Sequence, residues 1–130
     1  MEINLAFAEM ERAFAGQPHR PLRRSKKNDH EGPLVELSFV SPEVGARYAA
    51  VIEELEQATH WRVRVAASVD QQTVLATVRS LLPPTWRLTR DPGLDVAGRK
   101  VRLQLSGPPP AAEWAALEAA LREATGFGLA

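Results

Sequence analysis

The 130-residue sequence predicts a mixed α+β fold. Several short runs alternate apolar with polar residues, as half-buried strands do. The segments between them repeat apolar residues every three or four positions, as amphipathic helices do. In addition, the C-terminal segment repeats the pattern of an earlier one. With 45% hydrophobic and 25% charged residues, the composition is that of an ordinary globular protein.

Residues 1–16 are predicted to form an N-terminal helical arm. Four apolar residues of this segment share one helical face: Ile3, Phe7, Met10 and Phe14. A competing interpretation makes Ile3, Leu5 and Phe7 a strand, because they alternate with polar or small residues. A single helix of this length is marginal in water. We therefore expect it to dock on the rest of the chain, on a second copy or on a partner.

Residues 17–33 are predicted to form a basic, flexible linker. The segment has a net charge of +3, although the whole chain has 16 basic and 16 acidic residues. It is rich in proline and nearly free of apolar residues, so it cannot bury enough surface to offset the entropy lost on ordering. Its basic residues are Arg20, Arg23, Arg24, Lys26 and Lys27.

An internal repeat is the clearest feature of the remaining sequence. Residues 35–64 align without gaps on residues 101–130, at a displacement of 66. Nine positions are identical, and five more keep their apolar character. Most matched apolar pairs fall where a strand or helix would bury them, so each copy is predicted to fold as the same strand–helix–strand unit.

The first copy starts with a strand in which Val35, Leu37 and Phe39 alternate with polar residues. Ser41 followed by Pro42 is typical of a helix start, and this helix is expected to end at His60. The second strand continues from Trp61 to Val65 by alternation.

In the second copy, residues 108–110 begin the helix, Gly126 ends it, and Phe127 and Leu129 belong to the last strand.

Between the two copies, the sequence predicts a further helix and strand. Ser68 and Gln71 fit a capping box, and Pro83 with Pro84 ends the helix. Residues 85–90 alternate as a strand, residues 91–99 are rich in turn-forming residues, and residues 100–105 open the second copy.

Two strand–helix–strand halves with helices on one face are typical of a ferredoxin-like α/β sandwich. We therefore expect such a domain over residues 34–130, built from βαβ repeats at 35–66 and 101–130 with an inserted helix and strand. The helical arm and the basic linker would precede it.

Strand alternation also predicts a basic sheet face pointing away from the helices. Its basic residues would be Arg62, Arg64, Arg87, Lys100 and Arg102, joined by Arg23, Arg24, Lys26 and Lys27 of the linker. Arginine and lysine on an open sheet can bind the phosphates of DNA or RNA. The competing interpretation is a solvated or protein-covered face, on which these cations pair with Glu36 and its neighbours.

The outward strand positions carry no aromatic residue, because Trp61 and Trp86 fall on the apolar alternates and Trp114 on a helix stripe. A sheet that stacks bases on aromatic rings is therefore not expected. Contacts to the nucleic-acid backbone or to duplex shape are expected in its place.

The sequence favours a non-enzymatic nucleic-acid-binding accessory domain. The alternative is a protein-interaction or oligomerisation module, forming a homodimer or part of a larger protein. The chain has no cysteine, no phosphate-binding glycine loop and no nucleophile beside a base, and Asp29-His30-Glu31 is a poor metal site. We therefore expect no catalytic residue, metal or cofactor.

No apolar run reaches the roughly 18–20 residues of a membrane span. The composition, rich in alanine, arginine, proline and leucine, suggests a cytoplasmic protein of a bacterium with a GC-rich genome.

Overall fold

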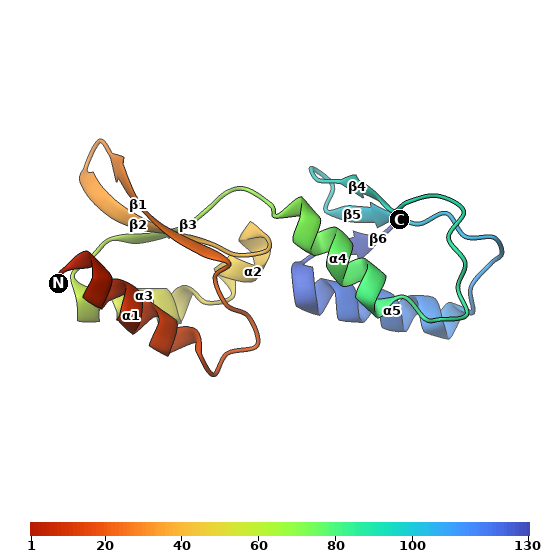
Figure 1. Ribbon diagram of the computed structural model, residues 1–130, viewed down its shortest axis with the longest axis horizontal. Coiled ribbons are helices and arrows are strands. Elements are labelled where there is room, and N and C mark those ends of the chain that lie inside the picture. Colours follow the sequence, from red (N-terminus) through yellow and green to blue (C-terminus); the bar gives the residue numbers. More distant parts are fainter. The chain divides into compact units, whose positions relative to one another are not determined.

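The computed structural model describes residues 1–130 and is a mixed α+β structure with five helices and two three-stranded sheets (Figure 1). The chain divides into two compact units, an N-terminal unit (Met1–Val69) and a C-terminal unit (Asp70–Ala130). The expected ferredoxin-like sandwich is not confirmed, because each unit has its own sheet. None of the helices is long and apolar enough to span a bilayer.

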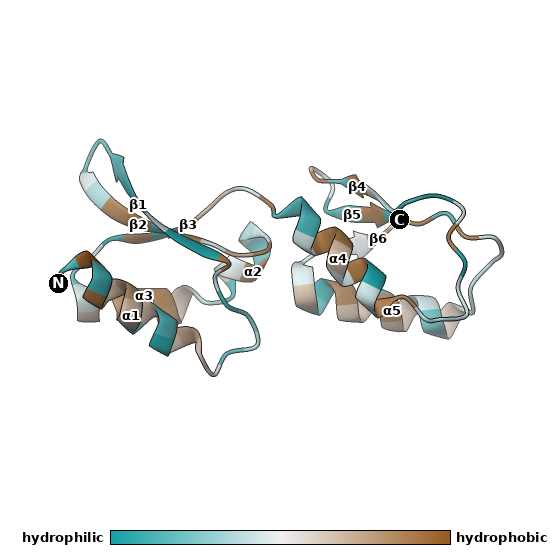
Figure 2. Ribbon diagram, in the orientation of Figure 1, coloured by the Kyte–Doolittle hydropathy of each residue, from teal (hydrophilic) through white to brown (hydrophobic).

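The N-terminal unit has a helix, a hairpin, a helical segment and a final strand. Strand β1 pairs antiparallel with β2, and β2 pairs parallel with β3. Strand β1 is hydrophilic, whereas its neighbour β2 contains apolar residues (Figure 2). The elements are α1 (Ile3–Phe14), β1 (Arg23–Asp29), β2 (Gly32–Ser38), α2 (Pro42–Ala46), α3 (Ala49–Thr59) and β3 (Val63–Val65).

The C-terminal unit has the same order of principal elements: helix, hairpin, helix and strand. Strand β4 pairs antiparallel with β5, and β5 pairs parallel with β6. The elements are α4 (Gln71–Leu81), β4 (Gly93–Asp95), β5 (Lys100–Arg102), α5 (Ala111–Thr125) and β6 (Gly128–Leu129). The helix that the sequence analysis treated as an insertion therefore takes the place in this unit that α1 takes in the first.

The displacement of 66 residues holds at the level of strand register. Val35 pairs with Val63 in the first sheet, and Val101 pairs with Leu129 in the second. The helix ends also correspond, because His60 and Gly126 both adopt the left-handed conformation, with φ of 60° and 80°. Glycine adopts this conformation freely, and histidine is among the residues enriched there.

The helical arm predicted at the N-terminus is confirmed as α1, and the competing strand interpretation is wrong. Glu2 caps the helix by accepting hydrogen bonds from the backbone N–H groups of Asn4 and Leu5. Met10 and Phe14 are buried, and the Phe14 ring lies edge-on to the ring of Phe39 at 5.6 Å. The helix therefore docks within its own unit, where it packs with α3.

The basic linker is the largest correction to the sequence-based elements. Residues 23–29 form strand β1, paired along its whole length with β2 from Arg23–Ser38 to Asp29–Gly32. The strand contains no apolar residue, so its pattern gave no sign of burial. Backbone pairing with an apolar neighbour orders it instead.

Four smaller corrections concern the element boundaries. The helix expected to run to His60 is divided into α2 and α3. Asp70, two residues beyond the expected N-cap Ser68, caps α4 by accepting from the Thr73 N–H at 3.0 Å. Residues 85–90 contribute only an isolated bridge, between Leu88 and Leu105. The strand expected over residues 100–105 accordingly ends at Arg102. Residues 91–99, expected to be a turn, include β4.

Candidate nucleic-acid interface

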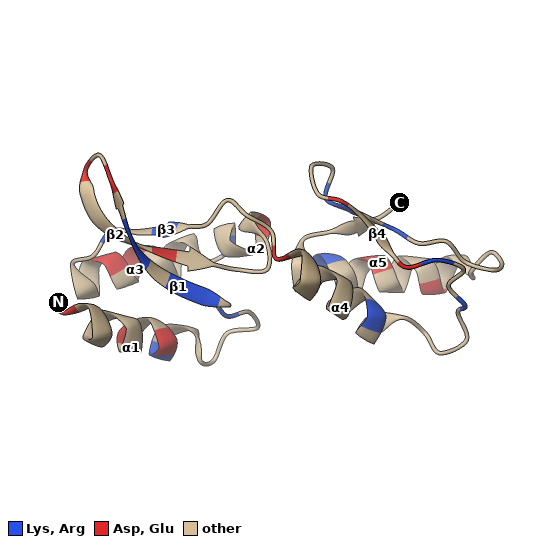
Figure 3. Cartoon of the chain, turned by 45° about the horizontal axis from the view of Figure 1, so that its top comes forward, with Lys and Arg blue, Asp and Glu red and all other residues tan.

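The structure divides the nine proposed phosphate-binding residues between the two units. Figure 3 shows basic residues along β1 and on β3, and acidic residues on α3 and α5. The N-terminal unit holds Arg23, Arg24, Lys26, Lys27, Arg62 and Arg64, and the C-terminal unit holds Arg87, Lys100 and Arg102.

Strand register places the cations of β1 on both faces of the first sheet. Arg24 is level with Leu37 and Val65, so it lies on the apolar face that the helices cover. Ser25 is level with Glu36 and Arg64, which places it on the outer face. Arg23 and Lys27, each two residues from Ser25 along β1, lie on the same face. The outer face therefore carries Arg23, Lys27 and Arg64, as alternation in β3 predicts for Arg64.

Arg62 is held by the β1–β2 turn. Its guanidinium donates to both carboxylate oxygens of Asp29, at 2.6 and 3.0 Å, and to Glu31 at 3.2 Å. It also donates to the carbonyl oxygen of Gly32 at 2.7 Å. Because the Arg62 carbonyl accepts from the Val35 N–H at 2.8 Å, both the backbone and the side chain of Arg62 are fixed to the hairpin. A two-bond pair of this kind is the strongest common geometry for arginine and carboxylate.

The hydrogen bonds from Arg62 lower the pKa of Asp29 from 3.8 to about 2, and the Glu31 N–H adds to the effect by donating to the same carboxylate. The Asp29 carboxylate therefore binds a proton less readily in the folded state than in the unfolded chain. The resulting stabilisation is fully present above pH 3.8 and is lost as the pH falls through about 2.

In Asp29→Asn, the free energy of unfolding should fall less steeply than in the unmutated protein as the pH is lowered from 3.8 to about 2. Chemical denaturation at a series of pH values measures both slopes, and equal slopes would contradict the expectation.

Two further cations of the N-terminal unit have partners. Arg64 donates to Glu36 at 2.9 Å across the parallel strands. The Arg24 guanidinium lies 5.3 Å from the centroid of the Phe7 ring and 3.8 Å from the Glu11 carboxylate. The pairing expected by the competing interpretation is therefore present for Arg64 and Glu36. Such exposed pairs contribute little to stability, so water or a phosphate can replace the partner at small cost.

The other six basic residues make no ion pair within 4 Å, and all but Lys100 are exposed at the surface. These six unpaired cations are Arg23, Lys26, Lys27, Arg87, Lys100 and Arg102. Lys100 and Arg102 are alternate residues of β5, on the face opposite the buried Val101. Both units therefore carry cations whose charge is available to an anion.

No group of three or more histidine, aspartate or glutamate side chains comes together in a way that could hold a metal ion. Asp29 and Glu31, the acidic residues beside His30, instead bind Arg62. No protein-family model matches this chain, and a search of curated proteins finds no significant similarity to it.

Proposed function

We propose that this chain is a non-enzymatic accessory domain that binds DNA or RNA through the phosphate backbone. The observation that supports the proposal is the set of six unpaired cations, which are divided between the two units. Each unit offers its own cations, so binding does not require a single ferredoxin-like sheet. The setting that goes with the proposal is the bacterial cytoplasm suggested by the composition.

The number of unpaired cations sets the expected strength and salt dependence. Each phosphate contact releases counterions, so affinity falls with a slope that is proportional to the number of contacts. If all six cations bind phosphate, affinity should fall by about 10³-fold between 50 and 200 mM salt. Arg62 and Arg64 would add less, because a phosphate must replace a carboxylate that already binds them.

The test compares charge reversals that have equal effects on net charge. Arg87→Glu/Arg102→Glu and Arg23→Glu/Lys27→Glu remove unpaired cations from the C-terminal and N-terminal units. Arg12→Glu/Arg79→Glu is the matched control, because each of its arginines lies on a helix beside a carboxylate. Every double variant exchanges two positive for two negative charges.

Fluorescence anisotropy with labelled single- and double-stranded DNA and RNA measures binding at low and moderate salt. We expect Arg87→Glu/Arg102→Glu and Arg23→Glu/Lys27→Glu each to lose at least about 10-fold in affinity and the helix control to change less. Equal losses in all three variants would indicate a response to net charge alone. Absence of binding to every probe at low salt would refute the proposed function.

The alternative, a protein-interaction or oligomerisation module, is favoured by a different observation. β1 is an edge strand with one unpaired side, and Leu5 and Leu22 of the same unit are 61% and 47% exposed. Open edges and exposed apolar residues are typical of protein-binding surfaces, although lysine on an edge strand opposes pairing. Light scattering at high protein concentration tests self-association, and a strict monomer would exclude the homodimer.

A further inference from the structure

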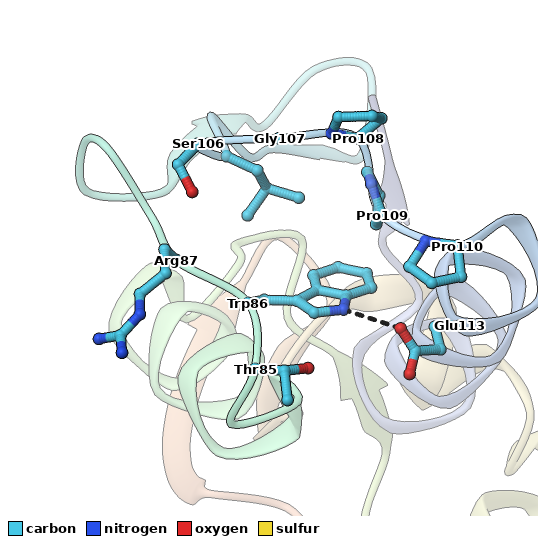
Figure 4. Close-up of a pocket in the computed structure, with 10 residues that line it drawn as sticks. Thr85, Trp86, Arg87, Ser106, Gly107, Pro108, Pro109, Pro110 and Glu113 are labelled. Carbon is cyan, nitrogen blue, oxygen red and sulfur yellow. Dashed lines mark hydrogen bonds between the residues drawn. The ribbon is translucent and has the colours of Figure 1, made fainter.

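The C-terminal unit contains a pocket that lies beside one of the unpaired cations. Its volume is about 350 Å³, which is within the range of small-ligand sites. The loop before β4 provides Thr85, Trp86 and Arg87, and the loop before α5 provides Ser106 and residues 107–110 (Figure 4). The Trp86 indole lies at the centre of the close-up, facing the space between these loops.

Two contacts orient the ring of Trp86, which is only partly buried. Its ring stacks on Trp114 of α5, with centroids 6.2 Å apart and planes 15° from parallel. The indole N–H donates to the Glu113 carboxylate at 3.2 Å. Because both contacts fix the ring, an incoming planar group would meet a surface that is already oriented, and little side-chain entropy would be lost on binding.

Charge is distributed unequally around this indole. Arg87 and Glu113 lie on opposite sides of Trp86 (Figure 4). The exposed guanidinium of Arg87 has no carboxylate within 4 Å and would attract a phosphate, whereas the Glu113 carboxylate would repel one. Pro108, Pro109 and Pro110 have no N–H group, so this loop offers few backbone donors to an anion. A phosphate therefore belongs at the Arg87 end of the pocket.

We infer that the pocket takes one unpaired base of a single-stranded nucleic acid, which stacks against Trp86 while a flanking phosphate binds Arg87. This inference rests on the proposed function and names its substrate class. An aromatic ring beside a cation is the combination that single-strand-binding proteins use. A base in a duplex would first have to leave its stack and its partner, which opposes binding of a duplex.

Sequence reasoning did not find this site because it treated residues 85–90 as a strand. In a strand, Trp86 would point with Leu88 to the helix-covered face. In the structure, residues 85–87 belong to a loop, and only Leu88 makes a strand bridge. The reason for expecting no base stacking on the sheet, that Trp86 falls on the apolar alternates of a strand, therefore does not apply to Trp86.

The test separates base stacking from phosphate contact. Three probes of equal length are titrated: a thymidine oligonucleotide, an abasic strand with the same phosphates, and a duplex. We expect the thymidine strand to bind about 5- to 150-fold more tightly than the abasic strand, which is the range of one base–aromatic contact. Trp86→Leu, which keeps an apolar side chain but removes the ring, should abolish this preference. Trp61→Leu, in the N-terminal unit, is the matched control and should retain it.

Each outcome decides a different point. If the intact protein binds none of the probes, the proposed function fails, and this inference fails with it. If it binds the thymidine and abasic strands equally well, phosphate binding stands and base stacking is refuted. A preference that survives in Trp86→Leu places stacking elsewhere and also refutes this site. The comparison of thymidine and abasic strands uses the unaltered protein, so it remains decisive if circular dichroism shows that Trp86→Leu is misfolded.

Discussion

Replacement of Leu121 by alanine should unfold the C-terminal unit and leave the N-terminal unit folded. Leu121 is fully buried in α5. Loss of a buried leucine side chain costs about 2–5 kcal/mol. A unit of roughly 60 residues buries a smaller share of its surface than a larger domain does and has only a few kcal/mol of stability to lose. The variant should therefore have a largely unfolded C-terminal unit at room temperature.

Leu55→Ala is the reciprocal control, because residue 55 corresponds to residue 121 in the internal repeat and is 5% exposed in α3. Hydrogen exchange measured by mass spectrometry on peptides from each unit follows the two regions separately. We expect Leu121→Ala to lose protection in peptides beyond Asp70 and Leu55→Ala to lose it in peptides before that residue. Equal loss of protection throughout the chain in both variants would show that the two units unfold as one cooperative structure.

The repeat could be predicted because burial constrains its residues. At positions such as Leu37 and Leu103 or Leu55 and Leu121, the two copies need apolar side chains in the same order. The left-handed helix end at His60 was predictable from Gly126 for a similar reason, because few residues adopt that conformation. Where the interior selects residue types, the pattern in the sequence therefore predicted the local structure.

The first half of each unit could not be predicted in the same way. Two residues separate the paired ends of β1 and β2, at Asp29 and Gly32, whereas four separate those of β4 and β5, at Asp95 and Lys100, so the displacement of 66 does not preserve the hairpin register. β1 has no apolar residue, and it is ordered by backbone pairing with β2. The residues of β1 themselves therefore give no sign that the segment is a strand. An edge strand rich in lysine and arginine therefore resembles a linker when only its composition is considered.

The candidate interface shows a related limit. Strand alternation predicted that Arg64 and Arg102 face away from the buried side, and both are exposed. It could not predict that Arg64 pairs with Glu36 while Arg102 has no partner, because pairing depends on strand register. Whether a basic residue is paired with a carboxylate or is available to a phosphate therefore differs from residue to residue.

Arg62→Glu should destabilise the N-terminal unit more than any other charge reversal among the nine basic residues. The change replaces donors to Asp29, Glu31 and the Gly32 carbonyl by a carboxylate beside two others. Arg64→Glu loses only the bond to Glu36, so its effect should be smaller. Arg62→Lys keeps the charge but cannot form the two-bond pair, so it should be intermediate. Thermal unfolding followed by circular dichroism measures the order, and equal melting temperatures for Arg62→Glu and Arg64→Glu would contradict it.

This order of stability decides how binding data for Arg62 can be interpreted. If Arg62→Glu loosens the β1–β2 hairpin, it also displaces Arg23 and Lys27, which lie on β1. Loss of nucleic-acid binding in Arg62→Glu would then follow even if Arg62 never touches a phosphate. Arg62→Lys separates the two effects, because lysine can still bind phosphate as a point charge while its pairing with Asp29 is weakened. Normal binding with a lowered melting temperature in Arg62→Lys, together with lost binding in Arg23→Glu/Lys27→Glu, would assign Arg62 to holding the hairpin and the unpaired cations to contacting phosphate.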